Sequence, residues 1–420
     1  MNTTTQSNNL SPCAFCDSAS MAPIMDFGDV ALAGAFLTED QFPNEKKYQL
    51  RLYFCRDCYA VQVIDKVDPS TLFADYFYFS SSIKTLCDHF AEYAKEVCSR
   101  FLVPEEATVV EIGCNDGVLL RPLAEQNIRT IIGVDPASNV VGTIKDPRIN
   151  IVNDFFGLVV AEKIIKSYGN VDMVVANNVY AHIPEIQSLT QAIHKVLKPD
   201  GVFIFEVHYL GRVINELQYD MVYHEHLYYY SLCSAINHFK RHGMIVFDVK
   251  AVSTHAGSMR FYVCKSKSKH ASKISEAVDR LLGEERKLGF DNYKTFAHFA
   301  EQVVERKLKL MNLLTTLKKE GKTIAGYGAS GRANTMIQYC GIDHTHLDYM
   351  IDDAPAKNGF FTPGSHLKIY PSSVLHQNNP PDYVLVLAWS FFKEISEKNQ
   401  EYLNNGGKMI VPLPEVRIFP

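Results

Sequence analysis

The feature that most constrains the fold is a strand followed by a glycine loop at residues 108–117, Thr-Val-Val-Glu-Ile-Gly-Cys-Asn-Asp-Gly. Valine and isoleucine favour the strand, and Gly113 and Gly117 let the backbone turn tightly and approach a ligand. The first strand carries Glu111 near its end, and the next predicted strand, 131–134, leads into Asp135. Because ligands bind beyond the carboxyl ends of parallel strands, these two acids predict a crevice that holds a ribose.

The spacing of the loop limits what this ligand can be. Gly-x-x-x-Gly is not the dinucleotide-binding fingerprint, and Glu111 stands where it would repel a phosphate. A ligand with a ribose and no pyrophosphate is therefore favoured, and S-adenosylmethionine is the commonest of these. The alternative is an ordinary strand–turn–helix unit without a ligand. The residues that we expect to bind this cofactor are Glu111, Gly113, Asn115, Gly117, Asp135, Asp154, Phe155 and Asn177.

Four cysteines form two Cys-x-x-Cys pairs, Cys13 with Cys16 and Cys55 with Cys58. Each pair places two thiolates on one tight turn, and two pairs supply the four sulfur ligands of a tetrahedral zinc ion. The gap between the pairs is longer than in common zinc ribbons. Four free thiols are the alternative, and the presence of two pairs disfavours a redox motif. With four protein ligands the metal has no open position, so we predict structural zinc that supplies folding energy.

The elements predicted along the chain indicate an α/β protein with three parts. They are a zinc-binding domain over 1–75, a Rossmann-like domain over 76–265 that is expected to bind S-adenosylmethionine, and a helical connector with a second Rossmann-like α/β unit over 266–420. In the central part, alternation of strands with helical patterns predicts a doubly wound parallel sheet. A turn is expected at 197–201, and 244–249 with 259–263 are expected to form an edge hairpin. The central strands are predicted at 109–111, 131–134, 149–152, 173–176 and 202–206.

The third part contains a second glycine turn, with Gly326, Gly328 and Gly331 after a predicted strand at 323–325. An acid, Asp352, follows about 20 residues later, so the turn matches the dinucleotide-binding fingerprint. Taken alone, it would predict an NAD-linked oxidoreductase. A single match is weak evidence, because many α/β turns use glycine only for helix–strand packing.

Charge and composition exclude several classes of protein. A formal net charge of −5 leaves no basic footprint, so we expect no nucleic-acid or membrane-surface binding. Residues 1–9 are polar and lack the apolar core of a signal peptide. No stretch approaches the roughly 18 consecutive apolar residues that span a bilayer. The six other cysteines are scattered, as is usual in a reducing compartment. We therefore expect a cytoplasmic protein.

A cluster of titratable side chains follows the fifth central strand, at Tyr223-His224-Glu225-His226. In an extended segment the two histidines would share one face, with Tyr223 and Glu225 on the other. A metal site is one reading, but the spacing does not match the helical His-Glu-x-x-His motif of zinc proteases. The other readings are acid–base catalysis by Glu225 and His226, or a polar loop packed on the sheet edge. His182 follows the fourth strand, near where a methyl group would leave.

Together these motifs resemble the sugar C-methyltransferases that act on nucleotide-linked 4-keto-deoxysugars, among them the 3-C-methyltransferase of tetronitrose biosynthesis. The resemblance covers nearly the whole chain and includes the cysteine pairs, the loop at 111–117, Asn177, the His182 loop and the motif at 223–226. It implies methyl transfer from S-adenosylmethionine to C3 of a dTDP-linked 4-keto-6-deoxyhexose by way of an enolate. The product would be a branched-chain deoxysugar, and we expect a monomer or a weak homo-oligomer.

The resemblance also implies roles for individual residues. His226 is implied as the base, in a pocket lined by Tyr223, Glu225 and His182. The nucleotide sugar would lie between the zinc domain and the central sheet, touching Asn177 and either Tyr76 or Tyr78. Relatives often carry a lysine at Ser330-Gly331-Arg332, so no ligand role is implied for that turn. The alternatives are a methyltransferase on another small molecule, an NAD-linked oxidoreductase on a nucleotide sugar, and a non-catalytic zinc scaffold.

Overall fold

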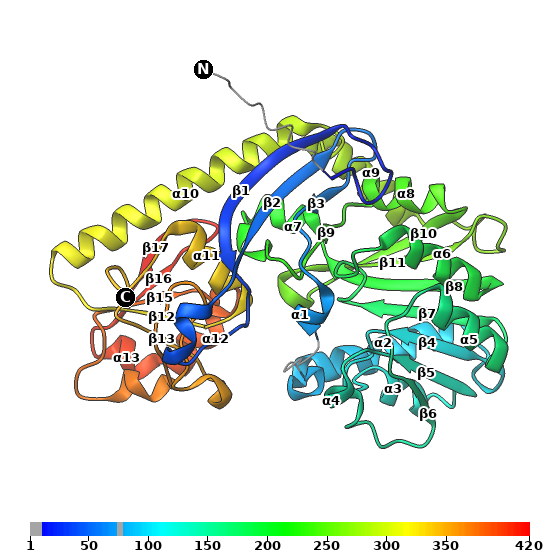
Figure 1. Ribbon diagram of the computed structural model, residues 1–420, viewed down its shortest axis with the longest axis horizontal. Helices are drawn as coiled ribbons and strands as arrows, with labels where there is room; N and C mark the ends of the chain where they lie inside the picture. Colours follow the sequence, from blue (N-terminus) through cyan, green and yellow to red (C-terminus); the bar gives the residue numbers. More distant parts are fainter. Residues whose placement is uncertain (1–10, 74–78) are drawn as a thin grey trace.

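The computed structural model describes residues 11–73 and 79–420 of the chain. Its strands form sheets of four, seven and six strands (Figure 1). The four-stranded sheet has the order β1-β2-β3-β9, and in Figure 1 its long β1–β2 hairpin runs between the two larger sheets. Its strands are β1 (Met21–Ala31), β2 (Lys47–Cys55), β3 (Val61–Val63) and β9 (Tyr228–Tyr229).

The seven-stranded sheet has the order β10-β11-β8-β7-β4-β5-β6. Strands β8, β7, β4, β5 and β6 run parallel, and the antiparallel pair β10–β11 closes one edge. The predicted Rossmann-like sheet and its edge hairpin are therefore confirmed. The strands are β4 (Thr108–Ile112), β5 (Thr130–Val134), β6 (Ile149–Val152), β7 (Val171–Asn177), β8 (Leu197–His208), β10 (Met244–Val252) and β11 (Ser258–Lys265).

The turn expected at 197–201 is wrong, because β8 already begins at Leu197. Leu197 pairs with Val171, and the register then shifts before Val202 pairs with Met173. The bulge accommodates the polar residues between them, Lys198 and Asp200, which are partly and fully exposed. A β-bulge of this kind keeps pairing continuous while it accommodates extra residues.

The six-stranded sheet has the order β14-β13-β12-β15-β16-β17, with β17 antiparallel to its neighbour. It confirms the second α/β unit. Its strands are β12 (Ile324–Tyr327), β13 (Tyr349–Ile351), β14 (Ile369–Tyr370), β15 (Tyr383–Val386), β16 (Lys408–Val411) and β17 (Arg417–Phe419). The connector contains α9 (Glu276–Leu288) and α10 (Tyr293–Lys319).

The remaining helices flank the sheets. Among the described residues, 11–73 and 79–420, no helix combines the length and apolar character that crossing a bilayer would require. The helices are α1 (Pro69–Phe73), α2 (Lys84–Phe101), α3 (Leu120–Glu125), α4 (Ser138–Val141), α5 (Leu158–Tyr168), α6 (Ile186–Val196), α7 (Leu210–Asn215), α8 (Leu232–Arg241), α11 (Gly331–Cys340), α12 (Phe392–Lys398) and α13 (Gln400–Asn404).

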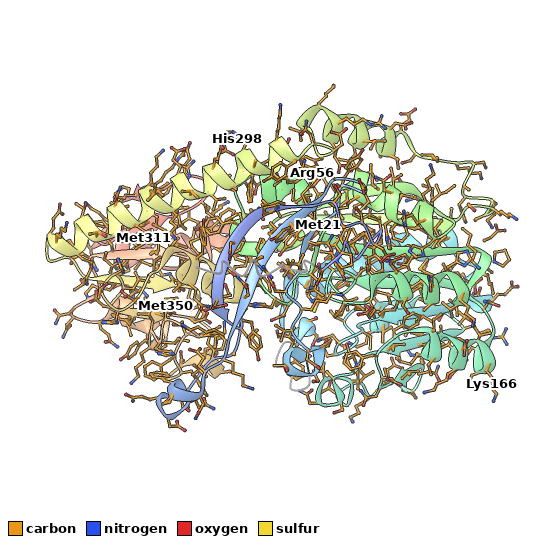
Figure 2. The ribbon with its side chains drawn as sticks, turned by 45° about the horizontal axis from the view of Figure 1, so that its top comes forward. Met21, Arg56, Lys166, His298, Met311 and Met350 are labelled. Carbon is orange, nitrogen blue, oxygen red and sulfur yellow. The ribbon has the colours of Figure 1, made fainter. Side chains whose placement is uncertain are left out.

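The amino-terminal hairpin contacts both of the larger units. Arg56 lies beside the first turns of α10 (Figure 2), with its guanidinium 4.7 Å from the centre of the Tyr293 ring. The Tyr293 hydroxyl donates to the Pro23 carbonyl at 2.6 Å. On α11, the side chain of Gln338 bonds both backbone groups of Ala31. On β2, the Gln49 carbonyl lies 3.1 Å from His224 Nε2 of the central part, so the hairpin connects the central part with the carboxyl-terminal unit.

Candidate functional site

The four cysteines of the two pairs come together at the end of the four-stranded sheet. Their Sγ atoms all lie within 4.8 Å of one another, with 3.5 Å between Cys13 and Cys58 and 3.6 Å between Cys16 and Cys55. At a zinc–sulfur distance of about 2.3 Å, the sulfurs of a tetrahedral site are about 3.8 Å apart. The cluster therefore fits a zinc ion. In addition, the Gln62 side chain donates to Cys13 Sγ at 3.1 Å, an outer contact of the kind that orients metal ligands.

The glycine loop after β4 has the geometry expected of a cofactor loop. Gly113 has φ +68°, and a Cβ atom there would lie 2.6 Å from Val179 Cγ2. Asp135 lies at the end of β5, where its carboxylate accepts from the amides of Asn115 and Ala137, both at 2.9 Å. Burial raises the pKa of this carboxyl. The loop and the Asp135 carboxylate thus form one constrained rim at the carboxyl ends of β4 and β5.

Buried polar atoms without partners lie near the ends of β4 and β7. Glu111 Oε2 and both amide atoms of Asn177 are buried and accept or donate no hydrogen bond within the described part of the chain. Burial, together with the charges of Asp135 and Asp116, raises the pKa of Glu111 well above its usual range. Buried polar groups are normally paired, so these atoms indicate a place where a polar ligand binds. S-adenosylmethionine, which has polar groups at both ends, fits this donor and acceptor set.

The remaining predicted cofactor residues lie after β6 and in the loop after β4. The Asp154 carboxylate accepts from the amide of Phe155 at 2.8 Å, and the Phe155 ring is 53% exposed. A ring exposed to this extent can stack on a flat ligand. At Gly117, which has φ +80°, a Cβ would lie 3.2 Å from Ile144. The loop therefore requires glycine at this position as well.

The Tyr223–His226 motif forms a turn, and the predicted extended face is wrong. The His226 amide donates to the Tyr223 carbonyl at 2.9 Å, which brings the two side chains together with 2.7 Å between Tyr223 Oη and His226 Nε2. His224 points elsewhere and bonds the Gln49 carbonyl on β2 through Nε2 at 3.1 Å. The two histidines therefore do not form a shared metal site. The pair that the turn brings together is Tyr223 with His226.

Two further predicted residues lie around this pair. The ring of His182 is 4.9 Å from that of His226, centre to centre. The contact arises because the amides of Leu227 and Tyr228 donate to the Ala181 carbonyl on the loop after β7. Burial raises the pKa of Glu225 to about 7. The arrangement thus places the rings of His182 and His226 side by side at the loop that follows β7.

The glycine turn of the carboxyl-terminal unit is occupied by the protein's own groups. The amide of Ala329, inside the turn, donates to the Asp352 carboxylate at 2.8 Å, and Lys357 Nζ pairs with the same oxygen at 3.0 Å. In a dinucleotide site, amides of this turn face the pyrophosphate. Here one of these amides, that of Ala329, is already bonded to Asp352. Arg332 is directed to Asp220, away from the turn.

Two predicted residues lie outside the described part of the chain, and two residues beside the site were not predicted. Tyr76 and Tyr78, predicted to touch the substrate, lie outside the described residues. The sequence analysis missed Gln62 at the zinc cluster and Asp220 beside the Tyr223–His226 turn. The only feature of the sequence that could have indicated Asp220 is its position three residues before Tyr223. Nothing in the sequence indicated Gln62.

Comparison with known proteins covers almost the whole chain. Residues 13–73 match a zinc binding domain family, residues 87–246 a methyltransferase domain family, and residues 253–414 the family of C-methyltransferase C-terminal domains. The C-methyltransferase NovU of Streptomyces niveus is 31% identical over 408 residues, which is 97% of this chain and 96% of NovU.

More distant matches cover a smaller share of the chain. A ubiquinone biosynthesis O-methyltransferase of Methylobacterium nodulans is 28% identical over 121 residues, or 28% of this chain and 46% of that protein. The structure of magnesium protoporphyrin IX methyltransferase from Synechocystis with bound S-adenosylmethionine is 14% identical and has a TM-score of 0.32. It covers 43% of this chain and 79% of that one. The identity to NovU over nearly both full lengths shows that this chain belongs to the zinc-containing, S-adenosylmethionine-dependent C-methyltransferases.

Proposed function

We propose that this C-methyltransferase adds a methyl group to C3 of a dTDP-linked 4-keto-6-deoxyhexose through an enolate. The observation that carries the proposal is the meeting of His182, Tyr223 and His226. His182 lies on the loop after β7, beside the cofactor crevice, and its ring packs 4.9 Å from that of His226. A base is therefore held next to the place where a methyl donor binds, as C-methylation of an acidic carbon requires.

The cofactor crevice is proposed to hold S-adenosylmethionine through the strand-end residues. Asp135 would bind the ribose hydroxyls, Asp154 and Phe155 the edge and face of the adenine, and Asn177 with Glu111 the polar groups nearest the sulfonium. Gly113, Asn115 and Gly117 would carry the backbone close to the ligand. When bound, the cofactor supplies a methyl group on a positively charged sulfur. The protein's part is to hold the acceptor carbon and that methyl in line, which is worth several orders of magnitude in rate.

The ketone at C4 makes the proton on C3 acidic, and His226 is proposed to remove it. His226 Nδ1 lies 3.1 Å from the Met221 carbonyl, which can only accept. The proton of the neutral ring is therefore on Nδ1, and the lone pair is on Nε2, toward Tyr223. As Nε2 takes the C3 proton, negative charge develops on the C4 oxygen. The Tyr223 hydroxyl and His182 are the proposed donors to that oxygen. C3 would then bond to the methyl carbon as the methyl–sulfur bond breaks, with S-adenosylhomocysteine as the leaving group.

The test is a reaction with dTDP-4-keto-6-deoxyglucose and S-adenosylmethionine that carries a CD3 group. Mass spectrometry should show a product in which one CD3 group has replaced one hydrogen, and NMR should place it on C3. dTDP-glucose, which lacks the ketone, is the matched control and should not react. Methylation of an oxygen, or equal reaction of the two sugars, would contradict the proposal.

The raised pKa of Glu225 predicts a pH-dependent stability. Its pKa is about 7 in the folded chain, above the ordinary value of 4.5, so folding favours the protonated form. The contribution is fully present below pH 4.5 and is lost as the pH rises through 7. At about 1.4 kcal/mol per pKa unit, the loss amounts to up to about 3 kcal/mol.

Glu225→Gln keeps the shape and removes the titration. Urea unfolding at several pH values should show the variant gaining stability relative to the parent as the pH rises from 4.5 to 8. Parallel curves for the two proteins would show that this carboxyl does not titrate differently on folding.

A further inference from the structure

The segment just before the Tyr223–His226 turn is held by the carboxyl-terminal unit. This segment, residues 219–222, contains the short η4 helix (Tyr219–Met221) and packs against α11. The Tyr219 hydroxyl lies 3.3 Å from Cys340 Sγ. The Thr335 hydroxyl donates to the Val222 carbonyl at 2.9 Å. Both ends of the segment are therefore fixed by side chains of α11.

Asp220 provides the strongest attachment. It is fully buried and accepts from Arg332 Nε at 2.9 Å, from Arg332 Nη2 at 3.2 Å and from Trp389 Nε1 at 2.9 Å. A two-pronged guanidinium contact fixes direction as well as distance. A buried carboxylate also needs its partners, because an unpaired charge is costly inside a protein. The backbone around residue 220 is therefore bound to the carboxyl-terminal unit in one orientation.

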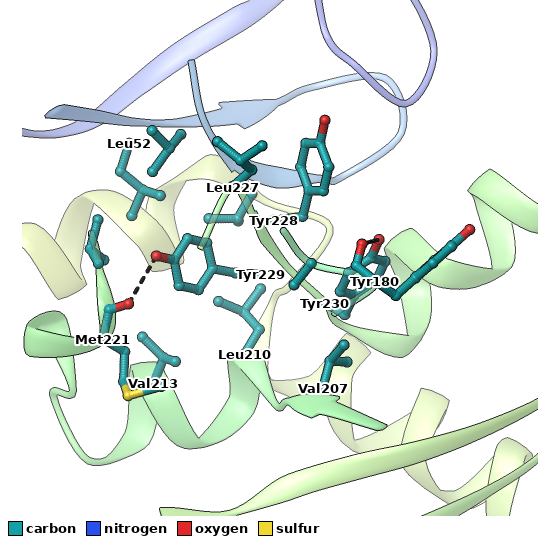
Figure 3. Close-up of a cluster of buried hydrophobic side chains, with 14 of the residues drawn as sticks. Leu52, Tyr180, Val207, Leu210, Val213, Met221, Leu227, Tyr228, Tyr229 and Tyr230 are labelled. Atoms are coloured by element: carbon teal, nitrogen blue, oxygen red, sulfur yellow. Dashed lines mark hydrogen bonds between the residues drawn. The ribbon is translucent and has the colours of Figure 1, made fainter. Parts of the chain in front are cut away.

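The Met221 carbonyl lies between these attached residues and reaches the base. It accepts from His226 Nδ1 at 3.1 Å. It also accepts from the Tyr229 hydroxyl at 3.0 Å, as Figure 3 shows. Tyr229 is itself buried and belongs to β9, which pairs with β3 in the four-stranded sheet that carries the cysteine cluster (the zinc sheet). The direction of this one carbonyl sets which nitrogen of His226 carries the proton and how the ring is aimed.

We infer that Arg332, with Thr335 and Trp389, positions His226 for proton removal through the Met221 carbonyl. The inference rests on the proposed function of His226 as the base. It gives the carboxyl-terminal unit a part in the chemical step, since the contacts of that unit determine where Met221 points. Arg332 and Thr335 are positioning residues in this scheme, and their loss should slow proton transfer more than it weakens binding of either ligand.

The test measures deuterium exchange at C3 of dTDP-4-keto-6-deoxyglucose in D2O by NMR. The full-length, zinc-loaded enzyme is used with S-adenosylhomocysteine, so that proton removal is observed without methyl transfer. Arg332→Met should slow exchange by about 10–100-fold, the effect of a small misplacement of a catalytic group. Thr335→Val should slow it by about 5-fold, the equivalent of one neutral hydrogen bond. Thr335→Ser, which keeps the hydroxyl, should restore the rate.

Gln338→Met is the matched control on the same helix. It removes the hydrogen bonds of α11 to Ala31 but touches no residue of 219–222 through a hydrogen bond, so exchange should stay near the parent rate. An increase in KM with unchanged kcat and exchange in Arg332→Met would show that this arginine binds substrate, and would overturn the inference. If Arg332→Met and Thr335→Val both exchanged at the parent rate, the positioning inference would be overturned and the proposed function would stand. If His226→Asn exchanged at the parent rate, the proposed function would be overturned as well.

Discussion

His226→Asn is expected to lower the rate of methyl transfer by about 10²–10⁴-fold, the usual contribution of a general base. Asparagine occupies similar space and can still donate to the Met221 carbonyl, which His226 Nδ1 contacts at 3.1 Å. It cannot accept a proton near neutral pH. Turnover measured with a ketosugar substrate should therefore fall, while calorimetry should show unchanged affinity for S-adenosylhomocysteine, because the strand-end residues of the crevice are untouched.

His224→Asn is the matched control for this variant. His224 lies on the same turn and is 2% exposed, but its ring bonds the Gln49 carbonyl of the zinc sheet. The substitution should weaken the contact between the Tyr223–His226 turn and strand β2 without removing the proposed base. If His224→Asn lost as much turnover as His226→Asn while remaining folded, the two histidines would share a structural role and the base would have to be sought elsewhere.

The strands that carry the cofactor crevice could be predicted because their evidence is local. A run of β-branched residues, a glycine at a left-handed position and an acid at the strand end all lie within ten residues at 108–117. Parallel pairing then places the ends of β4 and β5 side by side, as the register of Glu111 with Gly133 shows. The cysteine pairs were predictable for the same reason, since each pair forms on one turn.

The proton-transfer site could not be predicted in the same way because its geometry depends on distant contacts. Alternation in an extended segment separates Tyr223 from His226, whereas the turn that joins them is followed by a strand paired with the zinc sheet. Arg332 reaches Asp220 across more than a hundred positions of sequence. No local periodicity encodes a contact between segments so far apart in the chain, so the residues proposed to orient His226 were not evident from the sequence.

Removal of zinc is expected to abolish methyl transfer while leaving the cofactor crevice intact. Structural zinc supplies about 10–16 kcal/mol to small metal-binding domains, which equals or exceeds the roughly 5–15 kcal/mol that stabilises a typical folded protein. Without the metal, the sheet that contains β3 should therefore unfold. β3 pairs with β9 through Val61 and Tyr229, and the Val63 amide donates to the Leu227 carbonyl at 2.8 Å. Loss of β3 should release the segment next to His226.

Cys55→Ser, or treatment with a strong chelator, provides the measurement. Metal analysis should show loss of zinc, limited proteolysis should cleave the amino-terminal region, and turnover should disappear, while S-adenosylhomocysteine still binds. Cys98→Ala, a buried cysteine on α2 that lies outside the cluster, is the control and should retain both zinc and turnover. The coupling is specific to the proton-transfer site because the zinc sheet pairs with residues that follow His226, while the cofactor crevice is built on β4, β5, β6 and β7. Full activity in a zinc-free protein would therefore show that β9 holds its place, and with it His226, without the sheet that the metal stabilises.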